Sequence, residues 1–274
     1  MPRCLASRGG HAINDSLAAL RLYHELGIRY ITLTHFNTNN WADASTDAPR
    51  NDGLSLFGRD VVQEMDRLGM VVDISHTSDK TFWDTIEVTK NPIMASHSSA
   101  WELSNHPRNL KDDMLRAVAT NGGVVNVNFD PKYVSESLRV AYDKNESQMW
   151  EEIDELEKLA GRAPVAHWSG TPSYVEEQRK EIRKRYSEEQ EAMQLPNVSD
   201  VVDHIEHIAR VAGIDHVGLG SDFDGIPPPP IGMEDVSKFP NITEELVKRE
   251  YSAEDIRKVL GENTMRVMEA CVGE

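Results

Sequence analysis

The chain has 274 residues, of which 39% are hydrophobic and 27% are charged. This composition is typical of a soluble globular protein, and the length fits one large domain or two small ones. The formal net charge of -17 argues against nucleic acid as a partner, because phosphate backbones are bound by basic surfaces.

The apolar runs and the cysteines indicate the cellular location and limit the kinds of metal site. No apolar run approaches the roughly 18 to 20 residues that a membrane helix needs, and the N-terminus lacks the apolar stretch of a secretory signal. We therefore expect a cytoplasmic protein without a membrane segment. Cys4 and Cys271 lie at opposite ends of the chain, so they form neither a disulfide framework nor a thiolate zinc site. Any metal is expected to be held by His, Asp or Glu.

Helices and strands alternate along the first half of the chain. In residues 15–27, apolar residues at helical spacing follow an Asp/Ser start, and Gly27 ends this predicted helix. A short β-rich run then leads to His35, and a polar loop covers residues 36–53. The same order recurs, with further predicted helices at 57–69, 77–90 and 110–121 and predicted strands at 29–35, 70–76, 92–97 and 123–129.

A polar segment interrupts this alternation between residues 133 and 194. It is rich in Glu, Lys and Arg and predicts a helical insertion at about 135–195, with two helices around a turn at Gly161–Pro164. Its acidic residues are interpreted as a solvated helical surface. The alternation then resumes with a helix at 198–212, a strand at 216–222, and terminal helices at about 242–250, 252–260 and 263–271.

Strands that alternate with helices of this length predict parallel βα units, in an open doubly wound sheet or in a (β/α)8 barrel. A nucleotide-binding sheet would carry a Gly-rich fingerprint after its first strand, and Gly218-Leu-Gly220 lacks the third glycine. Chemical residues at the ends of the predicted strands favour the barrel. Only about five strands are clear, so we expect one incomplete TIM-barrel domain over residues 1–274, with its first strands missing.

Four of these strands are predicted to end in a residue that can do chemistry. Three end in histidines, His35, His76 and His97, and a later strand ends in Asp222. Parallel strands of a barrel bring their C-terminal ends to one rim, so we expect a shared metal or acid–base site there. Imidazole is a common zinc ligand, and a nearby carboxylate manages the proton of the attacking water. Asp224, just before Gly225, is interpreted as a turn or helix cap.

Other polar residues have a less specific meaning. Arg108 lies in the loop that leaves the rim after His97, where a guanidinium would either clamp a substrate carboxylate or form a surface salt bridge. His204 and His207 lie one turn apart on a predicted helix without the glutamate of an HExxH motif, and we expect them on a solvated or half-buried face. Ser98 is not part of a GxSxG elbow, which argues against a serine nucleophile.

Several segments together resemble the renal (membrane) dipeptidase family of zinc metallopeptidases. They include GGHAINDSLAALRLYHELGIRYITLTH, GLSLFGRDVVQEMDRLGMVVDISH, SHSSAWELSNHPRNLKDDMLR, NGGVVNVNF and GSDFDGI. The similarity runs from Gly9 to about Ala270 and is weakest over residues 135–195. The resemblance implies a (β/α)8 barrel with a two-zinc site that hydrolyses dipeptides, some with a C-terminal D-residue, and in some members opens β-lactam rings.

The resemblance implies only part of a metal site. His76 and His97 match the two histidine ligands of one zinc ion. The family carries a His-x-Asp pair on its first strand for the other zinc, and no such pair precedes Gly9 here. The family also has a glutamate directly before the Gly-Gly-His, bridging both metals, where this chain has Arg8. An arginine cannot ligate zinc, so two of five expected metal ligands are present.

The resemblance also implies how substrate would be held. His35 matches the histidine that contacts the substrate and steadies the developing oxyanion. Arg108, with Asn109 beside it, matches the arginine that binds the substrate carboxylate, and Asp222 matches the acid–base aspartate. The expected partner is therefore a dipeptide substrate, without nucleic acid or membrane, and the sequence is compatible with a homodimer.

The sequence is compatible with three hypotheses about function. The first is a zinc-dependent dipeptidase that hydrolyses the peptide bond with a metal-activated water. The second is a catalytically inactive, N-terminally truncated remnant or pseudoenzyme, which the missing first-strand ligands and Arg8 favour. The third is another hydrolase of the amidohydrolase type, which fits the contexts of Asp222 and His97 less well.

Overall fold

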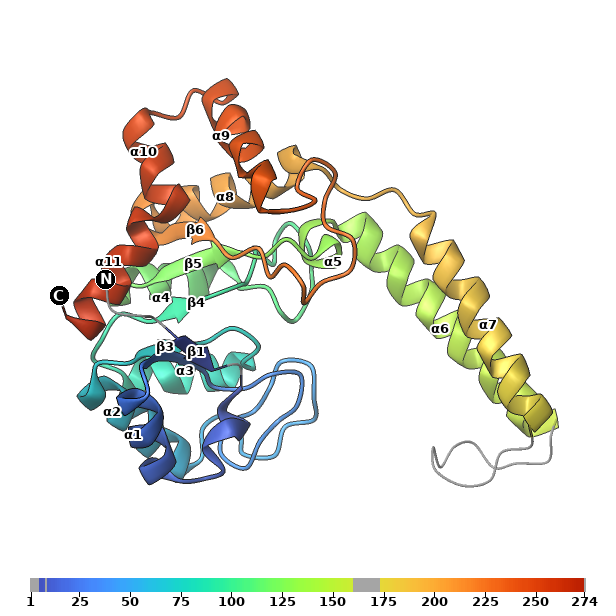
Figure 1. Cartoon of the computed structure of the whole chain (residues 1–274), viewed down its shortest axis with the longest axis horizontal. Coiled ribbons are helices and arrows are strands. Elements are labelled where there is room, and N and C mark those ends of the chain that lie inside the picture. Colours follow the sequence, from blue (N-terminus) through green and yellow to red (C-terminus); the bar gives the residue numbers. More distant parts are fainter. Residues whose placement is uncertain (1–4, 8, 160–172, 274) are drawn as a thin grey trace.

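The computed structural model describes residues 5–7, 9–159 and 173–273. Six short strands lie side by side and all parallel, in the order β1-β2-β3-β4-β5-β6 (Figure 1). Each strand therefore pairs with its neighbour in the sequence, as βα units require. The strands are β1 (Leu5–Ser7), β2 (Ile28–Thr32), β3 (Val71–Asp73), β4 (Met94–Ala95), β5 (Val124–Val127) and β6 (Val217–Leu219).

Most of the predicted helices are present, with ends shifted by a few residues. The helices are α1 (Leu17–Glu25), α2 (Leu56–Leu68), α3 (Asp79–Val88), α4 (Asp112–Asn121), α5 (Pro131–Val134), α6 (Glu136–Leu159), α7 (Ser173–Glu191), α8 (Val198–Ala212), α9 (Phe239–Lys248), α10 (Ala253–Arg257) and α11 (Asn263–Val272). Short 3-10 turns are η1 (Gly10–Ile13), η2 (Ile214–His216) and η3 (Val236–Lys238), and η4 (Lys258–Glu262) is a π-helical turn. None of the described helices is both long and apolar enough to cross a membrane.

The sheet is open along one side. Among the described residues no pairing joins β1 to β6, so the six strands match part of a (β/α)8 barrel, as the sequence predicted. One strand was not expected: Leu5–Ser7 pairs with β2, with Leu5 opposite Ile28 and Ser7 opposite Ile31. Three residues are too few to show a strand period, so only the pairing with β2 identifies β1.

The two faces of the sheet carry different cores, because alternate residues of a strand point to opposite sides. One face packs under α1 to α4 and α8, through Val72, Ala95, Val125, Val127 and Val217. On the other face Val71, Met94 and Val124 pack against Val267 of α11. These three residues begin their strands, so α11 covers the N-terminal end of the inner face. The C-terminal end is left for a site.

Local capping explains where the first helices begin and end. Ser16, Ser55 and Ser78 precede α1, α2 and α3, and each hydroxyl accepts a hydrogen bond from the backbone N–H three residues later. Such a cap is worth about 1 kcal/mol. Gly69 and Gly122 end α2 and α4 with φ of 72° and 82°, a left-handed conformation that glycine adopts without strain. The Asp/Ser start predicted for the helix at 15–27 is therefore confirmed at Ser16.

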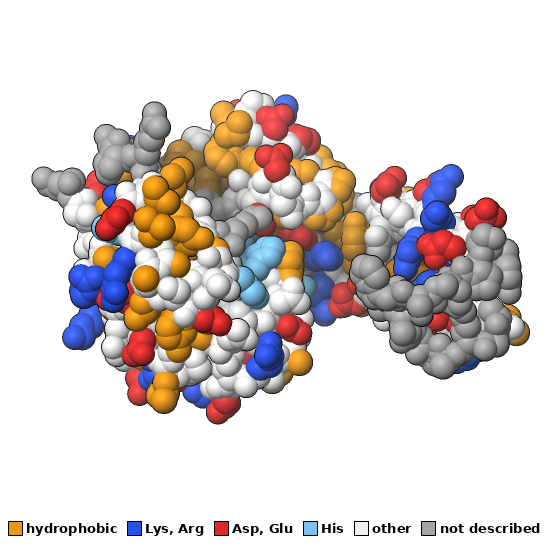
Figure 2. Space-filling view, turned by 60° about the horizontal axis from the view of Figure 1, so that its bottom comes forward, with side chains coloured by type: hydrophobic (Ala, Val, Ile, Leu, Met, Phe, Trp, Pro, Cys, Tyr) orange, Lys and Arg blue, Asp and Glu red, His pale blue; other side chains and the backbone are white. Residues whose placement is uncertain are grey.

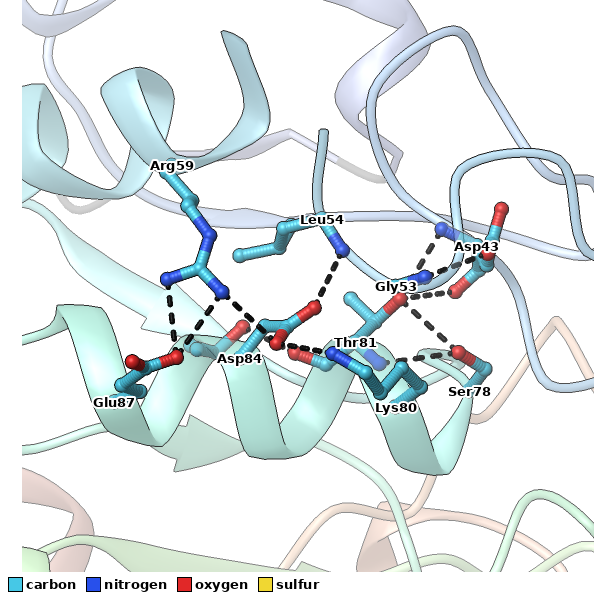
Figure 3. Close-up of polar contacts among 10 residues, drawn as sticks. Asp43, Gly53, Leu54, Arg59, Ser78, Lys80, Thr81, Asp84 and Glu87 are labelled. Atoms are coloured by element: carbon cyan, nitrogen blue, oxygen red, sulfur yellow. Dashed lines mark hydrogen bonds and ion pairs between the residues drawn. The ribbon is translucent and has the colours of Figure 1, made fainter. Parts of the chain in front are cut away.

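A buried carboxylate organises the loop that follows β2. Asp43 is 1% exposed, and its side chain accepts hydrogen bonds from the backbone N–H groups of Arg50 (2.9 Å), Asn51 (3.0 Å) and Gly53 (2.8 Å). Burial acts to raise the pKa of Asp43, but these hydrogen bonds outweigh it and lower the pKa. Its backbone oxygen also accepts a hydrogen bond from Thr81 of α3, so the loop is fixed against that helix (Figure 3).

The predicted insertion forms a projecting helical hairpin. The helices α6 and α7 lie antiparallel and extend away from the rest of the molecule (Figure 1). Between them the nearly buried side chains of Arg179 and Glu157 form an ion pair at 2.9 Å, and the Asn145 amide donates to Glu189 at 3.0 Å. The predicted turn at Gly161–Pro164 lies outside the described residues. The insertion is thus confirmed as helical over the two ranges that are described.

A second buried carboxylate joins the first two helices. Glu64 of α2 accepts hydrogen bonds from Arg67 of the same helix, at 2.7 and 2.8 Å, and from Arg21 of α1, at 2.6 Å. The hydrogen bonds from Arg67 contribute most, and with those from Arg21 they overcome burial and lower the pKa of Glu64 to about 2. The folded state therefore favours the ionised form of Glu64.

Replacement of this carboxylate should give a pH-dependent loss of stability. We expect Glu64→Gln to lower the free energy of unfolding by about 1–3 kcal/mol near pH 6. Because the folded pKa lies below the unfolded one, this difference should be complete above about pH 5 and should vanish as the pH falls toward 2. Urea unfolding of both proteins across this pH range measures it. A constant difference would contradict the assignment.

Candidate active site

The four residues predicted to end strands lie just beyond the strand ends. His35, His76 and Asp222 follow β2, β3 and β6 by three residues, and His97 follows β4 by two. The expectation that they belong to the strands was therefore wrong in detail, because the inter-strand hydrogen bonding stops earlier. All four still lie beyond the C-terminal ends of parallel strands, the side of the sheet that α11 leaves uncovered.

The three histidines form one cluster. Nε2 of His76 lies 2.8 Å from Nε2 of His97, and the rings of His35 and His76 have centroids 4.5 Å apart. His76 and His97 are only 4% and 5% exposed, and Phe36 packs edge-on against His76 at 5.2 Å. Histidine side chains gather near the middle of the body on the face shown in Figure 2. The tertiary structure thus brings together imidazoles that are far apart in the sequence.

Two of these residues have left-handed backbones. The φ angles are 68° at His76 and 59° at Asp222. This conformation is uncommon for residues other than glycine, and it costs on the order of 1–3 kcal/mol unless the surroundings hold it. Here the chain leaves each strand in a tight turn at these positions. The side chains are thereby placed at the rim and do not continue the alternation of the strand.

Asp222 has a neighbour that the sequence did not single out. Nδ2 of Asn128 donates to Oδ2 of Asp222 at 3.3 Å, and Asn128 is fully buried directly after β5. Its own Oδ1 accepts a hydrogen bond from the backbone N–H of Asp130 at 2.5 Å, which fixes the orientation of the amide. An asparagine within the otherwise apolar run GVVNVNF is the signal that could have identified it.

Glycines make room for the site in β6 and just after it. A Cβ atom on Gly218 would lie 2.2 Å from Oδ1 of Asn126, and one on Gly220 would lie 2.0 Å from the backbone oxygen of Ser96. Any side chain would therefore collide with the neighbouring strand or its loop. The pair Gly218 and Gly220 serves close packing beside Asp222, which replaces the weak nucleotide-binding interpretation.

Arg108 is buried at the same rim and is not a surface residue. It is 2% exposed; Nη2 donates to the backbone oxygen of His97 at 3.1 Å and Nη1 to the hydroxyl of Ser98 at 3.4 Å. Its guanidinium carbon lies 5.5 Å from the centroid of the Tyr133 ring. Burial, followed by the charges of Lys132 and Arg108, lowers the pKa of neighbouring His106 to about 3, so that histidine is neutral.

Asn109 supports the loop that carries Arg108. Its Nδ2 donates to the backbone oxygens of Ser104 (2.9 Å) and Tyr133 (2.8 Å), and its Oδ1 accepts from the backbone N–H of Ser99 at 3.0 Å. The amide is 3% exposed, and both of its N–H groups are directed at backbone. Asn109, which the resemblance placed beside the substrate-binding arginine, thus holds the loop in shape.

A cavity of about 1060 Å³ opens beside the site. His97, Ser96 and Asp222 line its polar end, and Met94 and Met268 line the part nearer α11. It lies along the inner face of the sheet, because its lining residues alternate with those that pack under the helices. The candidate site is therefore connected to a space larger than a single water molecule, as a site for a small ligand requires.

The chemistry of the donor set fits a metal ion. Two imidazole nitrogens that bind one zinc ion tetrahedrally, each at about 2.0–2.1 Å, lie roughly 3.3 Å apart. The two Nε2 atoms lie 2.8 Å apart, so the distance between them would have to increase by about half an ångström to admit the ion. His76 and His97 are therefore placed to share a metal, with Asp222 and His35 at the same rim.

The sequence predicted that the histidines of α8 lie on a solvated or half-buried face, and this prediction was wrong. His204 is fully buried and His207 is 7% exposed, because α8 packs between the loop after His97 and α4. Nδ1 of His204 accepts from the backbone N–H of Ala100 at 3.0 Å, and Nε2 lies 3.0 Å from the backbone oxygen of Val134. Burial lowers the pKa of His204 to about 4, so it is a neutral structural link.

A second cluster of potential ligands surrounds His207. Ligand atoms of Glu102, Asp112 and His207 lie within 4.8 Å of one another. However, Nη2 of Arg210 lies 2.9 Å from Nδ1 of His207, and a guanidinium can only donate. Nδ1 must then accept, so Nε2 carries the proton and donates to Asp112 at 2.7 Å. This arrangement opposes metal binding by Nε2 and favours a clamp between α8 and α4.

A histidine pair and a carboxylate beyond the C-terminal ends of parallel strands define the class of metallohydrolases built on (β/α)8 barrels. The particular family is identified by sequence. A sequence model of the membrane dipeptidases, peptidase family M19, matches residues 3–272, and the chain belongs to this family. The resemblance to this family noted in the sequence is thereby confirmed.

Known proteins of this family are similar along nearly the whole chain. An uncharacterized dipeptidase of Schizosaccharomyces pombe is 39% identical over 267 residues, which cover 96% of this chain and 51% of the relative. The dipeptidase aclJ of Aspergillus oryzae is 36% identical over 265 residues, covering 96% and 50%. The chain thus spans about half the length of the curated relatives it matches.

A solved structure confirms the fold. The crystal structure of the probable dipeptidase PvdM from Pseudomonas aeruginosa superposes with a TM-score of 0.79 at 26% identity, over 97% of this chain and 68% of that protein. The six parallel strands and their helices therefore correspond to about two thirds of the chain of that probable dipeptidase.

Zinc binding should distinguish the pair His76 and His97 from the second cluster around His207. In a His76→Ala/His97→Ala double variant, we expect no zinc site of micromolar affinity, because Asp112 and Arg210 already engage both ring nitrogens of His207. Titration with zinc against a chromogenic chelator measures this. As a control, His207→Ala should keep the zinc affinity of the unaltered protein within threefold while losing about 1–3 kcal/mol of stability. Tight binding by the double variant would contradict the tautomer argument.

Proposed function

We propose that this chain is a zinc-dependent dipeptidase, with His76 and His97 as ligands of one zinc ion. The observation that carries the proposal is the facing pair of Nε2 atoms, 2.8 Å apart and nearly buried, at the rim where Asp222 and His35 also lie. Membership of the M19 family and the dipeptidase names of the relatives support it. The polar end of the cavity gives a small substrate access to this rim.

The residues of the rim divide the work of peptide hydrolysis. A bound zinc ion supplies Lewis-acid chemistry that polarises a peptide carbonyl and eases the ionisation of water. Asp222 accepts a proton from the attacking water as its oxygen bonds to the carbonyl carbon, and returns that proton to the amine nitrogen as the C–N bond breaks. His35 contacts the carbonyl oxygen and stabilises the charge that develops there.

Arg108 provides the anchor for the other end of the dipeptide. Its guanidinium binds the C-terminal carboxylate, because a buried, fixed arginine makes strong charge-assisted hydrogen bonds to carboxylates. The contacts of Nη2 with the His97 backbone and of the guanidinium face with Tyr133 fix its position relative to the metal ligands. Asn109 contributes indirectly, since it ties the Arg108 loop to the backbone at Ser104 and Tyr133.

Removal of the acid–base group should reduce turnover strongly. We expect Asp222→Asn to lower kcat for a dipeptide such as Ala-Ala by about 10²- to 10⁴-fold, with KM changed less than threefold. Steady-state assays of the zinc-loaded protein measure this. Asp224→Asn is a matched control, because Asp224 has a similar left-handed backbone two residues away but is exposed. No turnover by the unaltered zinc-loaded protein would contradict the proposal and favour the inactive alternative.

Shortening the anchor should affect binding more than turnover. We expect Arg108→Lys to raise KM by about 10- to 100-fold and to change kcat less than tenfold, because lysine cannot make the bidentate contact. For a dipeptide amide, which lacks the carboxylate, the KM of this variant should equal that of the unaltered protein. Arg116→Lys on the exposed side of α4 is the control. An equal loss with dipeptide and amide would contradict the assignment.

A further inference from the structure

A buried carboxylate lies directly behind the metal-ligand pair. Asp73, the last residue of β3, is fully buried, and four donors point at its two oxygens. Oδ2 accepts from the hydroxyls of Thr32 and Ser96, each at 2.6 Å. Oδ1 accepts from the backbone N–H groups of Ser75 (3.1 Å) and Ser96 (2.9 Å). This carboxylate therefore joins residues from β2, from the loop after β3 and from the loop after β4.

The hydroxyl of Ser96 connects this carboxylate with a metal ligand. Its Oγ lies 2.6 Å from Oδ2 of Asp73 and also 2.6 Å from Nδ1 of His97. A hydroxyl has a single proton to donate, and a carboxylate can only accept. Ser96 must then donate its proton to Asp73 and accept at Oγ from Nδ1–H of His97. A neutral imidazole carries one N–H, so Nε2 of His97 is left with a lone pair.

We propose that Asp73 and Ser96 are positioning residues that hold His97 in the tautomer with its proton on Nδ1. The lone pair of Nε2 then faces His76, which is the form that a metal ligand needs. This inference deepens the proposed zinc site, and it names two residues that sequence reasoning did not select. Neither touches the substrate in the proposed mechanism; both act through the orientation and the proton of His97.

The backbone of His97 is fixed by the same group of residues. The backbone N–H of His97 donates to Oγ of Ser75 at 3.0 Å, and the backbone N–H of Ser75 itself donates to Asp73. The ring and the main chain of His97 are thus held from two directions by hydrogen bonds that lead back to one carboxylate. With the opposite tautomer, Nε2 of His97 would carry the proton and would have no lone pair for a metal. With the proposed tautomer, the proton of the 2.8 Å contact lies on Nε2 of His76 and would be released when a metal binds.

Two substitutions test the relay in different ways. In Asp73→Asn, the amide nitrogen at the position of Oδ2 donates to Ser96, so the serine proton turns to Nδ1 of His97 and moves the imidazole proton to Nε2. In Ser96→Ala, the link to His97 is lost while the backbone contacts of Asp73 remain. Thr32→Val is the matched control, because it removes another hydroxyl from the same oxygen without touching His97. Ser96→Thr keeps the hydroxyl and should behave like the unaltered protein.

The tautomer can be observed without metal and without catalysis. Long-range ¹H–¹⁵N correlation spectra of the metal-free protein at pH 8, with His97 assigned by the loss of its signals in His97→Gln, distinguish the two ring nitrogens. We expect His97 to be protonated on Nδ1 in the unaltered protein and in Thr32→Val, and on Nε2 in Asp73→Asn. Zinc dissociation constants, measured by chelator competition, should rise about 10- to 100-fold in Asp73→Asn and Ser96→Ala and less than threefold in the two other variants.

Each outcome decides the matter. A proton on Nε2 of His97 in the unaltered protein would overturn the proposal, as would unchanged zinc affinity in Ser96→Ala. If Asp73→Asn fails to fold, as judged by circular dichroism, Ser96→Ala against Thr32→Val still tests the relay. The tautomer measurement also stands apart from the dipeptidase proposal, because a protein that hydrolyses nothing can still show the Nδ1–H form of His97.

Discussion

The carboxylate of Asp73 is the interaction on which the arrangement of this site depends. It is fully buried where three neighbouring strands end, and its four hydrogen-bond donors come from Thr32, Ser75 and Ser96. A buried carboxylate is costly unless it is hydrogen-bonded, so these segments are held in one relative position. That position sets where the loops leave β3 and β4, and therefore where His76 and His97 meet.

The two ends of the sheet have different tasks as a result. At the N-terminal end, Val71, Met94 and Val124 pack against α11, and this apolar contact closes the inner face. At the C-terminal end, the strands stop two or three residues before the histidines and Asp222, and the loops take over. Stability and chemistry are thus separated along the strands, as is usual when parallel strands present a site at one rim.

Burial also explains why the histidines of this protein behave differently. His204 of α8 is fully buried and neutral, and its ring links the backbone of Ala100 with that of Val134. His207 lies between Arg210 and Asp112, which engage both of its ring nitrogens and place its proton on Nε2. At His97 the neighbours decide the opposite, because Ser96 and Asp73 direct the lone pair toward His76. Which nitrogen carries the proton therefore follows from the partner on the other side of each ring.

The sequence by itself determined the helices, the parallel βα order, the family and the residues of the rim, because period, caps and residue type are local signals. It could not show β1, whose three residues become a strand only by pairing with β2. It misplaced His204 and His207, because a helix alone does not reveal what packs on each face. Only the tertiary structure decided the roles of Asp73, Ser96 and Asn128, since hydrogen bonds between residues distant in sequence depend on which strands become neighbours.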